Sequence, residues 1–169
     1  MVPPDGYTTT ERPPKDAIAS TISELRDIFL NRVSTSMAIR EQYATDFSFH
    51  EISPADAVVT ARSSEEVSNI VRICAKHKVP IVPHGTGTSL EGHLAALRGG
   101  ICIDLSEMNN VIEVNSEDMD VTVEPGVTRK QLNEYLRDTG LFFPIDPGAD
   151  ASIGGMTATR ASGTNAVRY

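Results

Sequence analysis

The stretch from residue 57 to residue 82 constrains the fold more than any other part of the chain. It contains two short apolar runs, 57–59 and 79–82, with the length and composition of buried strands. Between them, Ser-Ser-Glu-Glu at 63–66 predicts a capping box at the start of a helix that ends near His77. The apolar face of this helix is expected at Val67, Ile70, Val71 and Cys74. A strand–helix–strand unit of this kind is typical of a mixed layer of helices and sheet.

Further helices and strands are predicted on both sides of this unit. Apolar residues at spacings of three and four predict a helix from Asp16, after a Pro- and Thr-rich leader at 1–14. Its apolar face comprises Ile18, Ile22, Leu25, Ile28 and Phe29. A short helix is expected over 36–43. Three more strands are expected at 101–105, 111–114 and 120–124.

The last third of the chain begins with a helix and then loses its periodicity. Thr128 and Gln131 predict a second capping box, and Gly140 is placed to end that helix. The buried face of the helix is expected at Leu132, Tyr135 and Leu136. Residues 144–169 are predicted to be loop-like, and we expect the domain to continue beyond residue 169. The fold class is therefore α+β, with mixed sheets and flanking helices.

Charge and cysteine content argue against several function classes. The net charge is −8 and the pI is about 4.9. Binding to nucleic acid depends on a basic face, so we expect no nucleic-acid partner. Cys74 and Cys102 lie in apolar patterns and form no Cys-x-x-Cys pair, so they predict buried free thiols rather than a zinc site. The N-terminus has neither the basic start nor the apolar run of a secretory signal.

A glycine-rich loop follows the second strand of the 57–82 unit. Its candidate ligand-binding residues are Pro83, His84, Gly85, Thr86, Gly87, Thr88 and Ser89. Glycines let backbone N–H groups approach a bulky anion, and the hydroxyls add donors, so the loop suits phosphate oxygens. It matches neither a Walker loop nor a dinucleotide-binding Gly-x-Gly-x-x-Gly fingerprint. A plain surface turn is an equally good reading of its composition. His84, Glu91 and His93 match no metal-ligand spacing, so no metal is expected.

A second segment, 143–163, is almost devoid of large side chains. Its candidate residues are Asp146, Pro147, Gly148, Ser152, Gly154, Gly155, Thr159, Arg160, Ala161 and Ser162. Such a segment packs poorly alone, but it can line a large planar or anionic ligand. The alternative is a disordered Gly/Ala tail.

Together the two segments resemble the FAD domain of the vanillyl-alcohol-oxidase superfamily, the type found in p-cresol methylhydroxylase (PCMH). The resemblance rests on Pro-x-Gly-x-Gly-Thr-Ser at 83–89, Asp-Pro-Gly at 146–148, Ser-Ile-Gly-Gly-Met at 152–156 and Thr-Arg-Ala-Ser-Gly at 159–163. The branch it looks most like contains D-lactate dehydrogenase (cytochrome), the glycolate oxidase subunit and alkyl-dihydroxyacetone-phosphate synthase. The resemblance implies an N-terminal leader with helices at 1–52 and an incomplete PCMH-type FAD-binding domain at 53–169.

The resemblance also implies roles for the two segments. The backbone of 83–89 would hold the FAD pyrophosphate, and 146–152 and 159–162 would line the flavin and ribityl chain. Arg160 would either lie beside the negatively charged flavin or form a salt bridge. Some relatives carry the flavin covalently on a histidine of the glycine loop. Thr88 occupies the matching place here, so non-covalent FAD is expected.

The activity implied by the resemblance is that of an FAD-linked dehydrogenase acting on a D-2-hydroxy acid. D-Lactate is the preferred substrate, with electrons passing to a cytochrome or quinone-type acceptor. The catalytic base and carboxylate clamp are expected beyond residue 169. The alternatives are a flavin-dependent synthase that exchanges an alkyl group, or a glycine-rich module that binds another anion. The expected location is cytoplasmic, or peripheral to the inner membrane, and mitochondrial in a eukaryote.

Overall fold

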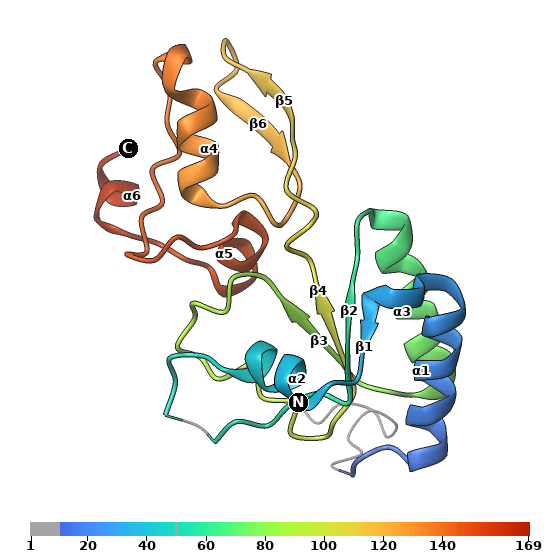
Figure 1. Cartoon of the computed structure of the whole chain (residues 1–169). Coiled ribbons are helices and arrows are strands. Elements are labelled where there is room, and N and C mark those ends of the chain that lie inside the picture. Colours follow the sequence, from blue (N-terminus) through green and yellow to red (C-terminus); the bar gives the residue numbers. More distant parts are fainter. Residues whose placement is uncertain (1–10, 50) are drawn as a thin grey trace, which may run out of the picture.

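A four-stranded sheet forms the base of the molecule in the computed structural model, which describes residues 11–49 and 51–169 (Figure 1). The strand order is β1-β2-β4-β3, with β2, β4 and β3 parallel and β1 antiparallel to β2. The strands are β1 (Val33–Ser34), β2 (Ala57–Thr60), β3 (Ile81–His84) and β4 (Ile101–Asp104). The predicted strand–helix–strand unit is confirmed, with β4 inserted between its two strands.

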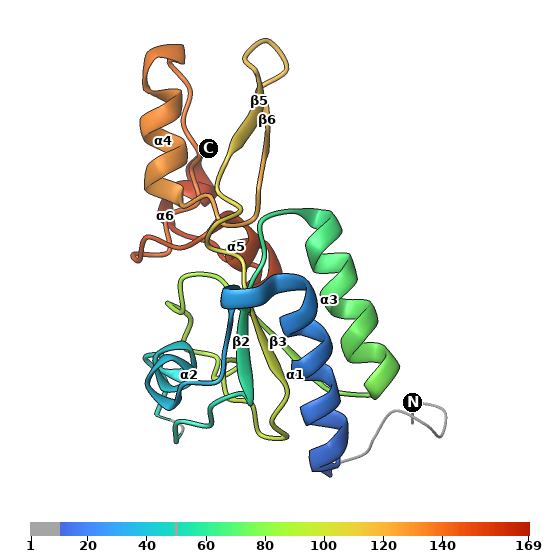
Figure 2. The same cartoon turned by 45° about the vertical axis from the view of Figure 1, so that its right-hand side comes forward.

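Helices cover both faces of this sheet. The helices around it are α1 (Lys15–Phe29), η1 (Leu30–Arg32), α2 (Met37–Ala44) and α3 (Ser64–His77). Figure 2 shows α1 and α3 on one face and α2 on the other. Side chains alternate accordingly along β4: Ile101 and Ile103 join the core under α1 and α3, whereas Cys102 packs on the α2 side. Strands β2 and β4 are therefore buried on both faces, which explains their apolar sequences, whereas the edge strand β3 is only partly buried.

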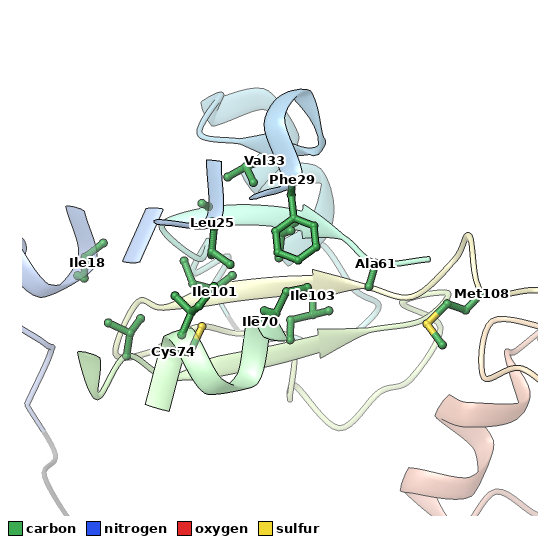
Figure 3. Packing of buried hydrophobic residues seen from close by; sticks show 14 residues of the cluster. Ile18, Leu25, Phe29, Val33, Ala61, Ile70, Cys74, Ile101, Ile103 and Met108 are labelled. Atoms are coloured by element: carbon green, nitrogen blue, oxygen red, sulfur yellow. The ribbon is translucent and has the colours of Figure 1, made fainter. Parts of the chain in front are cut away.

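The main core lies between the sheet and the helix pair α1–α3 (Figure 3). Leu25 and Phe29 of α1 meet Ile70 of α3 over the strands, and all three are buried. Ile28 and Val71 were predicted on the buried faces, but Ile28 is 52% exposed and Val71 is exposed as well. These two predictions are wrong because the buried face of each helix is narrower than the set of apolar positions in its sequence.

The first predicted capping box is only half formed. Ser63 accepts a hydrogen bond from the Glu66 N–H, as expected of an N-cap. The Glu66 carboxylate, however, accepts two bonds of 2.7 Å from the Arg32 guanidinium and one of 2.8 Å from the Arg62 N–H. The Glu66 carboxylate binds the Arg32 guanidinium instead of the Ser63 N–H, because a bidentate Arg–carboxylate pair is stronger than a hydrogen bond from a neutral backbone N–H. Glu66 thereby ties α3 to the segment just before β1.

The Arg32–Glu66 pair predicts a pH-dependent contribution to stability. The Arg32 hydrogen bonds hold the pKa of Glu66 below its ordinary value of 4.5. A depressed carboxyl pKa stabilises the fold at neutral pH, and this contribution disappears as pH falls through the folded-state pKa. We expect the free energy of unfolding to fall more steeply below about pH 5 in the wild type than in Glu66→Gln. Urea titrations at several pH values test this, and parallel curves for the two proteins would contradict it.

A hairpin, three α-helices and one short 3-10 helix form a second layer at one end of the sheet. Its elements are β5 (Val111–Asn115), β6 (Asp120–Val123), α4 (Arg129–Leu136), η2 (Arg137–Thr139), α5 (Ile153–Thr159) and α6 (Thr164–Arg168). Strands β5 and β6 pair antiparallel, and Val127, Leu132 and Leu136 form the small core beneath them. The Thr128–Gln131 capping box is confirmed, and Gly140 takes the left-handed conformation that ends η2. Tyr135 is 61% exposed, so its predicted burial is wrong.

The predicted loop over 144–169 is wrong in part, because α5 and α6 lie within it. Ser152 caps α5 by accepting from the Gly155 N–H, and the buried Met156 anchors the helix. Two glycines inside α5 give its sequence a low helix propensity, so the helix was not predicted. Packing and the cap outweigh that low propensity here.

The N-terminal segment shares the sheet and core of the rest. β1 pairs with β2, and α1 packs against α3. The predicted domain boundary between residues 52 and 53 stays a prediction. The leader prediction for 1–14 lies largely outside the described residues. Among the helices of the described residues, none combines the length and apolar character needed to cross a bilayer.

Candidate cofactor-binding site

The glycine-rich loop starts at the carboxyl ends of the parallel strands. His84 ends β3 and lies beside Asp104, the last residue of β4, in the strand register. Ligands of open parallel sheets bind outside the carboxyl ends of the strands, where loops from several strands meet. The second layer lies at this end of the sheet, and α5 lies close to the end of β3 (Figures 1 and 2).

A cavity of about 230 Å³ lies between the glycine loop and the small-residue segment. From the loop side it is lined by Gly85, Thr86, Gly87, Thr88, Ser89, Glu91, His93 and Leu94. From the other side it is lined by Pro147, Ala149, Ala151, Ser152, Gly155, Met156, Thr159 and Ala161. Segments some sixty residues apart in sequence thus form the two walls of one cavity.

Two glycines shape the loop wall. A Cβ atom at Gly85 would lie closer than 3.0 Å to the Ser152 Oγ, a separation that real Cβ atoms essentially never show. Gly85 therefore lets the loop approach the cap of α5. Gly87 has φ +66°, in the left-handed region that other residues rarely adopt. The loop turns back at this point and keeps its backbone along the cavity.

The cavity wall carries few charges. Among the described residues, Glu91 is the one carboxylate that lines it, His93 is the one imidazole, and no Lys or Arg side chain takes part. Anion binding there would depend on backbone N–H groups and on the hydroxyls of Thr86, Thr88 and Ser89. Within the part of the chain that the structure describes, no group of three or more His, Cys, Asp or Glu residues could hold a metal ion.

A buried polar cluster lies on the far side of the loop. Asp104 is only 3% exposed and accepts hydrogen bonds from the Tyr43 hydroxyl (2.9 Å) and the Thr60 hydroxyl (3.3 Å). The Tyr43 and His84 rings meet edge to face, with centroids 4.7 Å apart. Burial lowers the pKa of His84, so its ring is neutral at pH 7. Sequence reasoning missed Tyr43 and Asp104, although a carboxylate that ends an apolar strand is a signal for such a cluster.

Comparison with known proteins decides the family. The model of a family described as "FAD binding domain" matches residues 55–169. The chain belongs to this FAD-binding family. Its cofactor is FAD, as predicted. The match begins just before β2, so α1, β1 and α2 lie ahead of the matched segment.

Curated relatives and solved structures agree with this assignment. A probable mitochondrial D-lactate dehydrogenase of Danio rerio is 56% identical over 154 residues, which cover 90% of this chain and 31% of that protein. A mitochondrial D-lactate dehydrogenase [cytochrome] of Arabidopsis thaliana is 52% identical over 150 residues, covering 88% of this chain and 26% of that protein. The chain therefore spans under a third of the length of these relatives.

The fold is shared with a solved structure. An alkyldihydroxyacetonephosphate synthase superposes with a TM-score of 0.81 at 24% identity, over 94% of this chain and 35% of the other. A p-cresol methylhydroxylase superposes with a TM-score of 0.76 at 28% identity, over 88% of this chain and 30% of the other. Together with the family match, these likenesses confirm the predicted PCMH-type α+β fold. The predicted resemblance to the D-lactate dehydrogenase branch is confirmed as well.

The predicted site residues of this FAD-binding family member fall into two groups. Those that line the cavity are Gly85, Thr86, Gly87, Thr88, Ser89, Pro147, Ser152, Gly155, Thr159 and Ala161. Those outside its lining are Pro83, His84, Asp146, Gly148, Gly154, Arg160 and Ser162. Asp146 instead accepts hydrogen bonds from the backbone and side chain of Asn165. Arg160 ends α5 in the left-handed conformation. Ala149 and Ala151 also line the cavity, within the segment 146–152 that was predicted to line the flavin. Glu91, His93, Leu94 and Met156 line it without having been predicted to contact the cofactor.

Proposed function

We propose that the loop 85–89 and the α5 segment hold the diphosphate of FAD between them. The single observation that carries this proposal is that both segments line one cavity. Backbone N–H groups of a glycine loop are suited to diphosphate oxygens, and the wall offers hydroxyl donors from Thr86, Thr88 and Ser89. Ser152, which is 2% exposed, fixes the spacing between the two walls because the loop approaches it closely at Gly85.

The size of the cavity fits part of FAD. Sites for drug-sized ligands enclose roughly 300–1,000 Å³, whereas this cavity measures about 230 Å³. A dinucleotide is larger than most drugs, so the described residues would enclose the diphosphate and its neighbours rather than the whole cofactor. The predicted contacts of these segments that lie outside the lining, at Asp146, Gly148, Arg160 and Ser162, would flank this central part.

The activity that we infer is oxidation of a D-2-hydroxy acid, with D-lactate converted to pyruvate. Both curated relatives described above are D-lactate dehydrogenases by name. FAD supplies the electron-accepting chemistry when bound, and this chain binds and positions it. A cytochrome or quinone-type acceptor, and a mitochondrial location in a eukaryote, complete the proposal. The base and the carboxylate clamp are not assigned to any residue of this chain.

The mode of attachment follows from Thr88. This residue lines the cavity and carries a hydroxyl, which forms no flavin bond comparable to that of a histidine. We therefore propose that FAD is held non-covalently. Acid precipitation of the purified protein would then leave all flavin in the supernatant.

The activity is tested on the protein isolated from its source at its natural length. D-Lactate added without oxygen is expected to bleach the flavin absorbance near 450 nm, a band typical of oxidised flavin. L-Lactate is the matched control and should leave the band unchanged. A flavin that resists D-lactate but is bleached by dithionite would contradict the dehydrogenase proposal while leaving FAD binding intact.

A further inference from the structure

The His84 side chain lies behind the glycine loop rather than in the FAD cavity. It lines a second cavity of about 300 Å³, which also includes Tyr43, Asp104 and the loop residues Gly85–Gly87. A Cβ atom at Gly87 would lie 3.2 Å from the His84 Nε2. The imidazole Nε2 therefore lies near the turn at Gly87, where even a methyl side chain would crowd it.

Tyr43 holds this ring from the other side. Its ring meets the imidazole at an interplanar angle of 61°, and its hydroxyl is fixed on the buried Asp104. Aromatic pairs in this edge-to-face geometry attract beyond simple apolar contact. Burial, followed by the bond to Asp104, raises the pKa of Tyr43 above its ordinary value of 10.0, so the hydroxyl donates throughout the physiological range.

The contacts form a continuous path from α2 to the loop. Asp104 orients Tyr43, the Tyr43 ring confines His84, and His84 supports the turn at Gly87. Helix α2 lies ahead of residue 55, where the match to the FAD-binding family begins. This path thus begins at a residue outside the matched segment.

We propose that Tyr43 is a positioning residue for the FAD-binding loop and acts through the His84 ring. That the ligand is FAD rests on the proposed function, whereas the predicted effect of Tyr43 on the order of the loop does not. A loop that is already held in its binding shape loses less freedom when the ligand arrives, so its affinity is higher. Removing the ring would loosen residues 86–88 and weaken binding without touching the cavity wall.

The test compares three variants of the 169-residue chain. Tyr43→Leu removes the ring, and Tyr43→Phe keeps the ring but loses the bond to Asp104. Ile73→Ala is the matched control. Ile73 is a buried residue of α3 in the main core, and α3 packs on the face of the sheet opposite α2. Thermal unfolding measures the general destabilisation of each. Backbone order parameters for residues 86–88 are measured by NMR in the ligand-free chain, and FAD affinity by titration.

The expected results separate positioning from general stability. Tyr43→Leu should lower the order parameters of residues 86–88 and weaken FAD binding at least about tenfold. Ile73→Ala should lower the melting temperature and leave both readouts near wild type. Tyr43→Phe should retain most of the loop order, because the ring still confines His84.

Two results would overturn the proposal. One is an unchanged loop in Tyr43→Leu, or a change no larger than that of Ile73→Ala. The other is a loop in Tyr43→Phe as disordered as in Tyr43→Leu, which would exclude the route through the ring. If the unmodified chain binds no FAD, the proposed diphosphate site fails. The loop order of the ligand-free chain still decides the role of Tyr43.

Discussion

Gly85→Ala is expected to weaken FAD binding by at least about a hundredfold, which corresponds to ~2.7 kcal/mol. The added methyl group would overlap the Ser152 Oγ, so either Ser152 gives up its cap bond on α5 or one of the two segments moves. Both are walls of the same cavity, and movement of either one changes the distance across it. Titration of the purified chain with FAD measures the loss of affinity.

A second substitution separates steric overlap from other effects. In Gly85→Ala/Ser152→Ala the Oγ is gone, and the nearest remaining atom, the Ser152 Cβ, lies 3.5 Å from the new methyl group, an ordinary contact. The double variant should therefore bind FAD more tightly than Gly85→Ala alone. Ser152→Ala by itself removes the α5 cap and should cost about 0.5–2 kcal/mol of stability. No recovery in the double variant would mean that the Gly85–Ser152 approach does not control the site.

Phe29→Ala is expected to lower the free energy of unfolding by about 3–5 kcal/mol. Phe29 is among the largest fully buried side chains and sits at the centre of the core between α1, α3 and the sheet. Ile28→Ala is the matched control, because Ile28 is mostly exposed one position earlier. Its substitution should change stability by less than about 1 kcal/mol. Urea unfolding of the three proteins measures both values.

The same experiment bears on the domain boundary proposed between residues 52 and 53. If residues before 53 were a separable leader, Phe29→Ala would leave the unfolding of the remaining chain unchanged. A single cooperative transition that shifts as a whole would instead join α1 to the FAD-binding segment. We expect the single transition, because α1 and α3 share one core.

The sequence was most informative where a local pattern and the tertiary packing agree. The strands at 57–60 and 101–104 are buried on both faces, so their unbroken apolar runs identify them directly. Helix α3 has a Ser63 cap and a strong apolar periodicity, and its predicted end at His77 is confirmed. These features depend on neighbours in the sequence, and for that reason they were predictable.

The predictions failed where distant residues decide the outcome. The Glu66 carboxylate left its expected capping bond for Arg32, a partner 34 positions away. Helix α5 forms in a glycine-containing stretch because Ser152 and Met156 are buried by the rest of the fold. The cluster of Tyr43, His84 and Asp104 joins three elements, and no spacing rule connects them. In the candidate site, sequence patterns identified the two walls but not the support behind the loop.

The central claim is that residues 85–89 and the start of α5 hold one FAD diphosphate between them. Titrating the isotope-labelled chain with FAD while recording backbone amide NMR shifts tests this most directly. The account predicts saturable shifts of the amides at 85–89 and at 152–155 with one common dissociation constant. Shifts confined to one of these segments, or saturable shifts located elsewhere in the chain, would contradict it.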